Sequence, residues 1–263
     1  MNDFLVNDDI FKFLNKIKEA YESIDFDPKQ EYKDSSLYIM CELLGKHGWV
    51  ATGFGNGSEL NDWQENIKNG KPDDNVLFFT DNNCENLNKI LDSFTDDLDG
   101  KAQLRWFTPC KRDLLNRSVK LFRDEDYFLS ALLQCLIIEY CLRTQVNEGI
   151  IPFHKRDSAN NLLVKTDEKL RSKFSDNPIF EKRVATKGFV LKQDIPSLIG
   201  FFDRLFAAAK DFTIPEPTHI NRNWLLHGMS EREVTQIDCI QLLNCLHTLV
   251  GVICYLREED TQG

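Results

Sequence analysis

Apolar residues recur three and four positions apart along most of the chain, which is the spacing of one face of an α-helix. One segment, residues 127–142, is apolar nearly all round instead of on one face, and this predicts a buried central helix. Residues 52–75 are rich in glycine, asparagine and aspartate and are predicted to form a loop. The clearest helical patterns, each predicting an amphipathic helix, cover residues 8–21, 35–45, 112–122, 195–209 and 230–256.

Residues that commonly begin or end helices set the expected boundaries. Pro196 suits the first turn of the helix over 195–209. A short helix is expected between Thr218 or Asn221, either of which can cap its N-terminus, and Gly228, which can terminate it. The run S-E-R-E at 230–233 matches a capping box for the last helix.

The predicted fold class is all-α. Polar residues over 25–34 and 147–161 are expected to be connections, and a helix is expected over 162–174. The C-terminal part, residues 112–263, is predicted to be a helical bundle domain. Residues 1–111 are predicted to form a mostly helical N-terminal extension whose role the sequence does not give.

The composition is that of a folded protein. With 263 residues, 42% of them hydrophobic, the chain can bury a sizeable core. The most apolar stretches contain charges such as Glu139 and Asp203, so no membrane span is expected. At the start, no basic segment precedes an apolar one, so no signal peptide is expected either. These features predict a cytoplasmic protein with no membrane partner.

Eight cysteines are scattered along the chain without a C-x-x-C pair, and most lie among leucine and isoleucine in helical patterns. Structural zinc sites need clustered thiolates or imidazoles, so neither a metal nor a disulfide framework is expected. The cysteines are predicted to be reduced and to serve as small core residues. No segment implies a cofactor.

The formal net charge of -10 is unevenly distributed. Residues 1–100 hold 21 acidic against 9 basic side chains, a net of -12, which leaves +2 for residues 101–263. An acidic surface repels a polyanion, so the C-terminal part is favoured for any surface that faces nucleic acid. The charges equally fit the solvated faces of ordinary helices.

The run NRNWLLHG at 221–228 places a fixed positive charge and a titratable side chain five residues apart, just before the last long helix. It contains R-x-x-x-x-H, with a polar residue directly after the arginine and a glycine directly after the histidine. With two long apolar helices before this motif and one after it, residues 112–258 resemble the HEPN superfamily. HEPN domains are helical bundles found in prokaryotic toxins, phage-defence proteins and RNA-processing factors.

The resemblance implies a ribonuclease site, and the residue types fit that chemistry. Attack of a 2′-hydroxyl on the adjacent phosphate needs a group that takes and gives a proton near neutral pH, as His227 can. Arg222 is always protonated and forked, so it can bind the phosphate oxygens while negative charge develops on them. Asn223 can donate further hydrogen bonds to the phosphate or position the arginine. This mechanism requires no metal.

The spacing of the motif also bears on the oligomeric state. Positions five apart on an α-helix lie roughly 140° apart around its axis, so Arg222 and His227 do not share one face of a regular helix. HEPN proteins typically dimerise so that two motifs meet in one cleft. A two-fold interface would bring both pairs within reach of one phosphodiester, so a homodimer is predicted.

Glu139 is the only charged residue in the apolar run over 127–142 and is a further candidate for the site. A buried carboxylate needs a partner, and Arg222 or His227 would be natural ones. HEPN proteins often carry such an acidic residue on an earlier helix facing the motif. Alternatively, Glu139 lies at the exposed edge of its helix or pairs with Arg143, four residues later. His219 is close enough in sequence to line the same cleft.

Two functions remain open. The first is a metal-independent endoribonuclease of the HEPN kind, a toxin or phage-defence effector acting on RNA through Arg222, His227, Asn223 and Glu139, with a neutralising or regulatory protein partner. The second is a non-catalytic all-α scaffold that binds a partner protein or a regulatory RNA. The net charge of -10 favours the second, because a nuclease acting on any RNA is usually more basic. In that case Arg222 would bind the last carbonyls of a neighbouring helix and His227 would be a core histidine.

Overall fold

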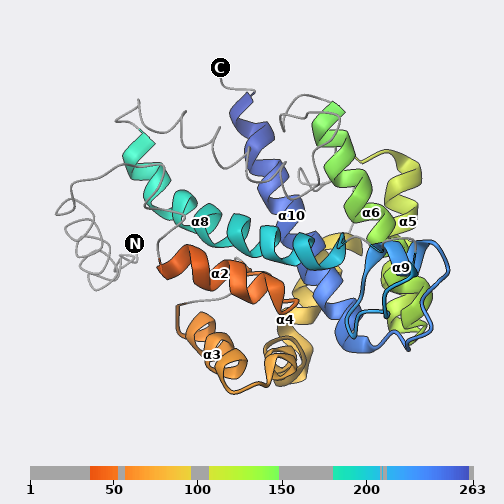
Figure 1. Ribbon diagram of the computed structural model, residues 1–263. Helices are drawn as coiled ribbons and strands as arrows, with labels where there is room; N and C mark the ends of the chain where they lie inside the picture. The colour runs from red at the N-terminus through yellow and green to blue at the C-terminus, as the bar shows by residue number, and fades with distance from the viewer. Residues whose placement is uncertain are drawn as a thin grey trace.

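The computed structural model describes residues 36–52, 57–95, 107–147, 180–207, 209 and 212–260. Within them it contains eight α-helices, one 3-10 helix and no strand, which confirms the all-α fold class (Figure 1). Apart from Asn147, the predicted helices over 8–21 and 162–174 and the predicted connections over 25–34 and 147–161 lie outside the described residues. The elements are α2 (Ser36–Lys46), α3 (Gly57–Lys68), η1 (Pro72–Val76), α4 (Leu77–Thr95), α5 (Pro109–Arg123), α6 (Tyr127–Asn147), α8 (Phe180–Leu205), α9 (Arg222–Leu226) and α10 (Gln236–Asp260).

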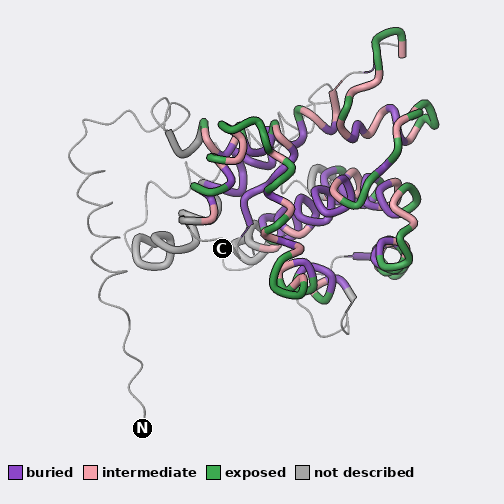
Figure 2. Tube along the Cα trace, turned by 90° about the horizontal axis from the view of Figure 1, so that it is seen from below, coloured by how far each residue is buried: buried purple, intermediate pink, exposed green. Residues whose placement is uncertain are grey.

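Helix α10 lies at the centre of the core. It packs against α4, α6 and α8, and buried residues gather between these helices (purple in Figure 2). A helix with several neighbours needs apolar residues around most of its circumference. Between residues 239 and 253, only His247 and Gly251 are more than slightly exposed. The wide core face predicted for the last helix is therefore confirmed.

Helix α6 is less buried than its sequence predicts. It packs against α5 and α10, and its Ile138 is fully buried. However, Phe128, Leu129 and Leu136 are 43%, 44% and 39% exposed. The prediction of a central, buried helix therefore holds for one side of α6 only, because its described neighbours leave part of its apolar circumference uncovered. We call these three side chains the α6 apolar surface.

Helices α6 and α10 each contain a stretch long and apolar enough to cross a membrane, Tyr127–Thr144 and Gln236–Cys254. From the sequence we expected charged residues to keep the apolar stretches too short for a membrane span. By length and composition, that expectation is wrong for these two stretches. Length and composition do not distinguish a span from a core helix. Most of the α10 stretch is buried inside the protein, as in a core helix, and less than half of the α6 stretch is.

Helices α2 and α8 lie side by side (Figure 1) and touch backbone to backbone at two glycines. A Cβ atom on Gly200 would lie 2.0 Å from the carbonyl oxygen of Glu42, and one on Gly45 would lie 2.0 Å from that of Ser197. Protein atoms do not pack this closely. The contact therefore requires that neither position carries a side chain.

Residues 49–52, which follow α2, are held by polar side chains of two other helices. The amide of Ala51 donates to Ser197 Oγ of α8 at 3.0 Å, and its carbonyl oxygen accepts from Thr248 Oγ1 of α10 at 3.1 Å. Asn244 Nδ2 of α10 donates to the preceding carbonyl oxygen at 2.7 Å. Since a buried backbone group without a partner is costly, these contacts allow an irregular segment to lie in the core.

The prediction of a loop over residues 52–75 is wrong, because much of this stretch forms α3 and the start of η1. Its glycine and asparagine content masks a helical spacing of Leu60 and Trp63, both of which are buried. Trp63 packs against Trp49, with ring centroids 6.0 Å apart. The burial of these side chains stabilises a helix that local propensity alone disfavours.

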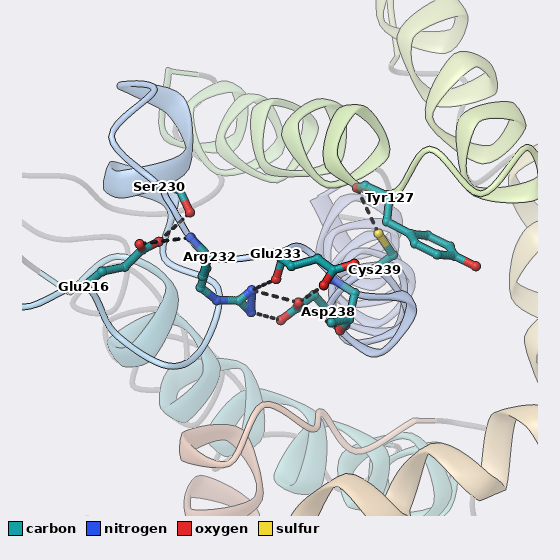
Figure 3. Close-up of polar contacts among 8 residues, drawn as sticks. Tyr127, Glu216, Ser230, Arg232, Glu233, Asp238 and Cys239 are labelled. Carbon is teal, nitrogen blue, oxygen red and sulfur yellow. Dashed lines mark hydrogen bonds and ion pairs between the residues drawn. The ribbon is translucent and has the colours of Figure 1, made fainter.

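Two predicted helix starts are also wrong. Pro196 lies inside α8 and not in its first turn, although it cannot donate a backbone hydrogen bond. Helix α10 starts after Thr235, which forms a capping box with Asp238. The amide of Thr235 donates to Asp238 Oδ2 at 2.8 Å, and the amide of Asp238 donates to Thr235 Oγ1 at 3.4 Å. The hydroxyl of Ser230, the residue expected to cap α10, donates to Glu216 instead (Figure 3).

We predict that Gly200→Ala lowers the free energy of unfolding by about 3 kcal/mol or more, because the new methyl group would push α2 and α8 apart. Gly251→Ala on α10 is the matched control. A Cβ atom there meets open space, and alanine is favoured over glycine inside a helix by about 1 kcal/mol. Urea unfolding followed by circular dichroism measures both variants. Equal stabilities would contradict the backbone contact.

Asp194 is an acid in the core, on α8. Burial raises the pKa of its carboxyl group well above the usual range, because the ionised form loses its hydration. Among the described residues, no hydrogen bond or ion pair of this carboxyl group offsets the loss. Ionisation of this group therefore destabilises the folded chain.

We predict that Asp194→Asn becomes increasingly stabilising as the pH rises from 4 to 8. In the unfolded chain aspartate ionises at about pH 4, whereas the folded protein resists ionisation. The stability contributed by the protonated acid is complete below that pH and is lost as the pH rises through the raised folded pKa. Each pKa unit between the two states is worth about 1.4 kcal/mol. Thermal unfolding across this pH range measures the difference, and a constant difference would refute the raised pKa.

Candidate functional site

The motif at 221–228 forms helix α9 and both of its ends. Asn221 is the N-cap, and its Oδ1 accepts from the amides of Asn223 and Trp224 at 2.9 and 3.3 Å. Gly228 follows the helix with a φ of 67°, a left-handed value that suits glycine. The predicted cap at Asn221 and the predicted end at Gly228 are both confirmed.

Two asparagine side chains join α9 to the C-terminal end of α8. Asn221 Nδ2 donates to the carbonyl oxygens of Ala207 and Arg204 at 3.1 and 3.4 Å. Asn223 Nδ2 donates to that of Ala207 at 3.0 Å. The last carbonyl groups of a helix have no partner within it, so the motif supplies hydrogen bonds where α8 ends. The position of α9 is thereby tied to that of α8.

Arg222 is oriented by two side chains and keeps two donors. Its Nε and Nη2 donate to Glu139 Oε2 of α6 at 3.0 and 2.5 Å, and its Nη1 donates to Asn223 Oδ1 at 2.9 Å. A guanidinium has five N–H groups. These contacts use three of them, and among the described residues the other two, one on each terminal nitrogen of this partly exposed side chain, have no partner. Two such groups can bind an anion bidentately.

Asn223 therefore has both ends of its amide occupied. Its Oδ1 accepts from Arg222 and its Nδ2 donates toward α8. Of the two roles expected from the sequence, the geometry fits the one that positions the arginine. A purely structural Arg222 would bind the last carbonyls of a neighbouring helix, but it is Asn221 that donates to such a carbonyl, that of Arg204 in α8, and both asparagines donate to Ala207 just after the helix.

Glu139 makes both of the contacts that the sequence offered as alternatives. Its Oε2 accepts from Arg222, and its Oε1 accepts from Nε and Nη2 of Arg143 at 2.8 and 2.5 Å. Burial would raise the pKa of Glu139, but hydrogen bonds from Arg222 and Arg143 outweigh it and hold the pKa below its usual range. The carboxylate is ionised at neutral pH and stands between two guanidinium groups.

His227 lies at the end of α9 and is exposed, so it is not a core histidine. Its ring packs against Phe212, with centroids 5.6 Å apart. In the part of the chain that the structure describes, no hydrogen bond of the imidazole is found. Arg222 contacts α6, whereas His227 contacts the segment before the motif. The two side chains thus approach different elements, in line with their spacing.

Phe212 is a neighbour of the motif that sequence reasoning missed. It packs edge-on against Trp224 at 5.1 Å as well as against His227. Its φ of 59° is left-handed, which is rare and costly for a bulky side chain. A backbone held in this way places the aromatic ring beside the histidine. The sequence carried no signal of it, because the conformation depends on these tertiary contacts.

His219 has surroundings unlike those of a proton carrier. Burial, and then the charge of Arg204, lower the pKa of His219 to about 4. The imidazole also forms a hydrogen bond with the Arg204 backbone. A ring that stays neutral and bonded to the end of α8 fits a packing role better than proton exchange near neutral pH.

A second polar cluster joins the segments before and after the motif (Figure 3). Glu216 accepts from the amides of Glu231 and Arg232 at 2.9 and 3.2 Å and from the hydroxyl of Ser230. Nη1 and Nη2 of Arg232 bind the two carboxylate oxygens of Asp238 at 2.9 and 2.6 Å. The chain on either side of α9 is therefore fastened to the first turn of α10.

Potential metal ligands are not grouped in the described part of the chain, where no three His, Cys, Asp or Glu side chains could hold one ion. Cysteines 41, 135, 141, 239 and 245 are buried. Burial raises the pKa of Cys41 and of Cys239 to about 12. These two side chains are thiols at neutral pH and pack as small core residues.

We predict that Asn221→Ala lowers the free energy of unfolding by about 1 to 2 kcal/mol, because it removes the N-cap of α9 and two donors to α8. Thr218→Ala is the matched control, since Thr218 was the other possible cap and is exposed. Its effect should stay within about 0.5 kcal/mol. Urea unfolding compares the two. A larger loss in Thr218→Ala would show that the cap is assigned to the wrong residue.

Comparison of the chain with protein-family models, with curated proteins and with solved structures finds no match. Its class is therefore stated at the level of its architecture: it is an all-α protein.

Proposed function

We propose that the protein is an endoribonuclease of the HEPN type, which works without a metal ion in a composite site made by two copies of the chain. One observation carries the proposal. In the R-N-x-x-x-H-G motif, Arg222 is oriented by Glu139 and Asn223 and keeps two donors that no described residue uses, and the exposed His227 ends the same short helix.

In the proposed reaction, the 2′-hydroxyl of one nucleotide attacks the adjacent phosphorus and the bond from phosphorus to the 5′-oxygen breaks. His227 of one copy accepts the proton of the 2′-hydroxyl, and a protonated His227 of the other copy gives a proton to the leaving 5′-oxygen. The free N–H groups of Arg222 bind the phosphate oxygens and stabilise the developing charge. The products are a 2′,3′-cyclic phosphate and a 5′-hydroxyl.

Glu139 and Asn223 act through the arginine in this scheme. Their hydrogen bonds fix the plane of the guanidinium before the substrate arrives, which is how a site avoids reorganisation in the transition state. Glu139 also gives the partly buried arginine a counter-charge. We therefore assign positioning roles to both residues.

A homodimer is part of the proposal, because Arg222 and His227 of one copy approach different elements. The α6 apolar surface supports it, since large exposed apolar side chains favour association. Helix α6 carries Glu139 and contacts α9. Met229, directly after the motif, is also well exposed. A second copy that covered this surface across a two-fold axis would bring two motifs toward each other.

In the cell, such an enzyme would be a cytoplasmic toxin or phage-defence effector under the control of a neutralising or regulatory protein. The competing candidate is a non-catalytic scaffold for a protein or a regulatory RNA, which the net charge of -10 favours. Toxicity separates the two. Slowed growth on overexpression that His227→Ala relieves supports the nuclease, whereas no toxicity in either form supports the scaffold.

We predict that the purified protein cleaves total RNA with EDTA present, and that His227→Ala and Arg222→Ala each slow cleavage by about 100-fold or more. His47→Ala and Arg117→Ala are matched controls for the loss of a histidine and of an arginine away from the motif. Denaturing gels measure the rates, and light scattering measures the oligomeric state. Equal cleavage by mutant and wild type would reject the nuclease, and cleavage by a monomer would reject the composite site.

A further inference from the structure

Arg143 shares the carboxylate that holds the motif arginine. It lies one helical turn after Glu139 on α6, and its Nε and Nη2 donate to Oε1. The other oxygen of the same carboxylate accepts from Arg222. Two guanidinium groups therefore stand next to each other with only one carboxylate between them.

The charges of this group do not balance. Among the described residues, one carboxylate faces two arginines, which leaves one net positive charge. The side chain of Arg143 is 74% exposed. Of its five N–H groups, two are used by Glu139, and in the described part of the chain the other three have no partner. A cation exposed in this way beside the motif can take an anion from solution.

Helix α5 carries an ordinary pair for comparison. Arg117 donates to Asp113, also four residues apart, at 2.8 Å, and its side chain is 67% exposed. There, one carboxylate neutralises one cation, and such pairs contribute little to stability. Arg143 differs in that its carboxylate is already paired with the motif arginine. Helix spacing explains the contact between Arg143 and Glu139 but leaves the excess charge unexplained.

We propose that Arg143 is a second phosphate-binding residue of the same site, which holds the phosphate next to the one that is cleaved. This inference rests on the proposed ribonuclease function and names its substrate class more closely. A nucleic-acid strand carries one phosphate per nucleotide, so two adjacent cations match two consecutive phosphates. The preferred substrate is then an oligonucleotide with at least two phosphates and not an isolated phosphodiester.

The first test measures binding, independently of cleavage. The ligand is a short single-stranded RNA whose 2′-oxygens are methylated, so that it cannot react. For Arg143→Gln we expect the slope of log affinity against log salt to fall by about 0.7 for each phosphate that the protein no longer neutralises. Arg117→Gln removes a charge of similar exposure and should leave the slope unchanged. Arg143→Lys keeps the charge and should retain most of the slope.

The second test separates substrate contact from positioning of Arg222. A trinucleotide carries the flanking phosphate, and a dinucleoside monophosphate lacks it. Arg143→Gln should lower kcat/KM for the trinucleotide about tenfold, as expected for the loss of one charge-assisted hydrogen bond. It should lower kcat/KM for the dinucleoside monophosphate by a clearly smaller factor, because Glu139 keeps its own contact with Arg222. Equal reductions on both substrates would show that Arg143 only positions the motif, and would overturn the proposal.

The two tests fail in different ways. If the wild-type protein cleaves neither substrate but its RNA affinity depends on Arg143 in the expected way, the nuclease is rejected and the phosphate contact stands. If Arg143→Gln and Arg117→Gln change the salt slope equally, or if the methylated RNA does not bind, the phosphate contact is rejected whatever the activity.

Discussion

The backbone contact between α2 and α8 is the constraint on which the candidate site depends. Gly45 and Gly200 let the two helices touch, which fixes how α8 lies against α2. The end of α8 is the point to which Asn221 and Asn223 attach the motif helix. Asn223 in turn orients Arg222. The helix that α2 packs against is thus connected, through two asparagines, to a guanidinium of the motif.

The parts of the fold that depend on neighbours along the chain were predictable, and the parts that depend on distant partners were not. Apolar spacing alone located α10 and most of the other described helices. The run S-E-R-E has the pattern of a capping box, yet Glu216 takes the hydroxyl of Ser230 and the cap of α10 falls on Thr235. Helix α3 was missed because the burial of Trp63, a tertiary effect, outweighs the glycine and asparagine around it.

The candidate site shows the same division. The residues of the motif and its cap at Asn221 were visible in the sequence, because they lie within a few positions of each other. The need of a buried carboxylate for a partner favoured Arg222 or His227 beside Glu139, and helix spacing favoured Arg143 as the alternative. The structure joins Glu139 to both arginines, since a carboxylate has two oxygens and each can accept from a different guanidinium. The left-handed backbone conformation of Phe212, whose ring packs on His227, could not be predicted from the sequence, because it depends on tertiary packing.

The charge of the whole protein and the charge of the candidate site have opposite signs, and this bears on how a nucleic acid would be selected. A net charge of -10 repels a polyanion at long range and slows its approach. At physiological salt such repulsion is screened beyond about 8 Å. Within that distance the excess positive charge on Arg222 and Arg143 would act on individual phosphates. A protein of this kind would discriminate against bulk RNA and favour a strand that fits the guanidinium pair, as expected of a regulated effector.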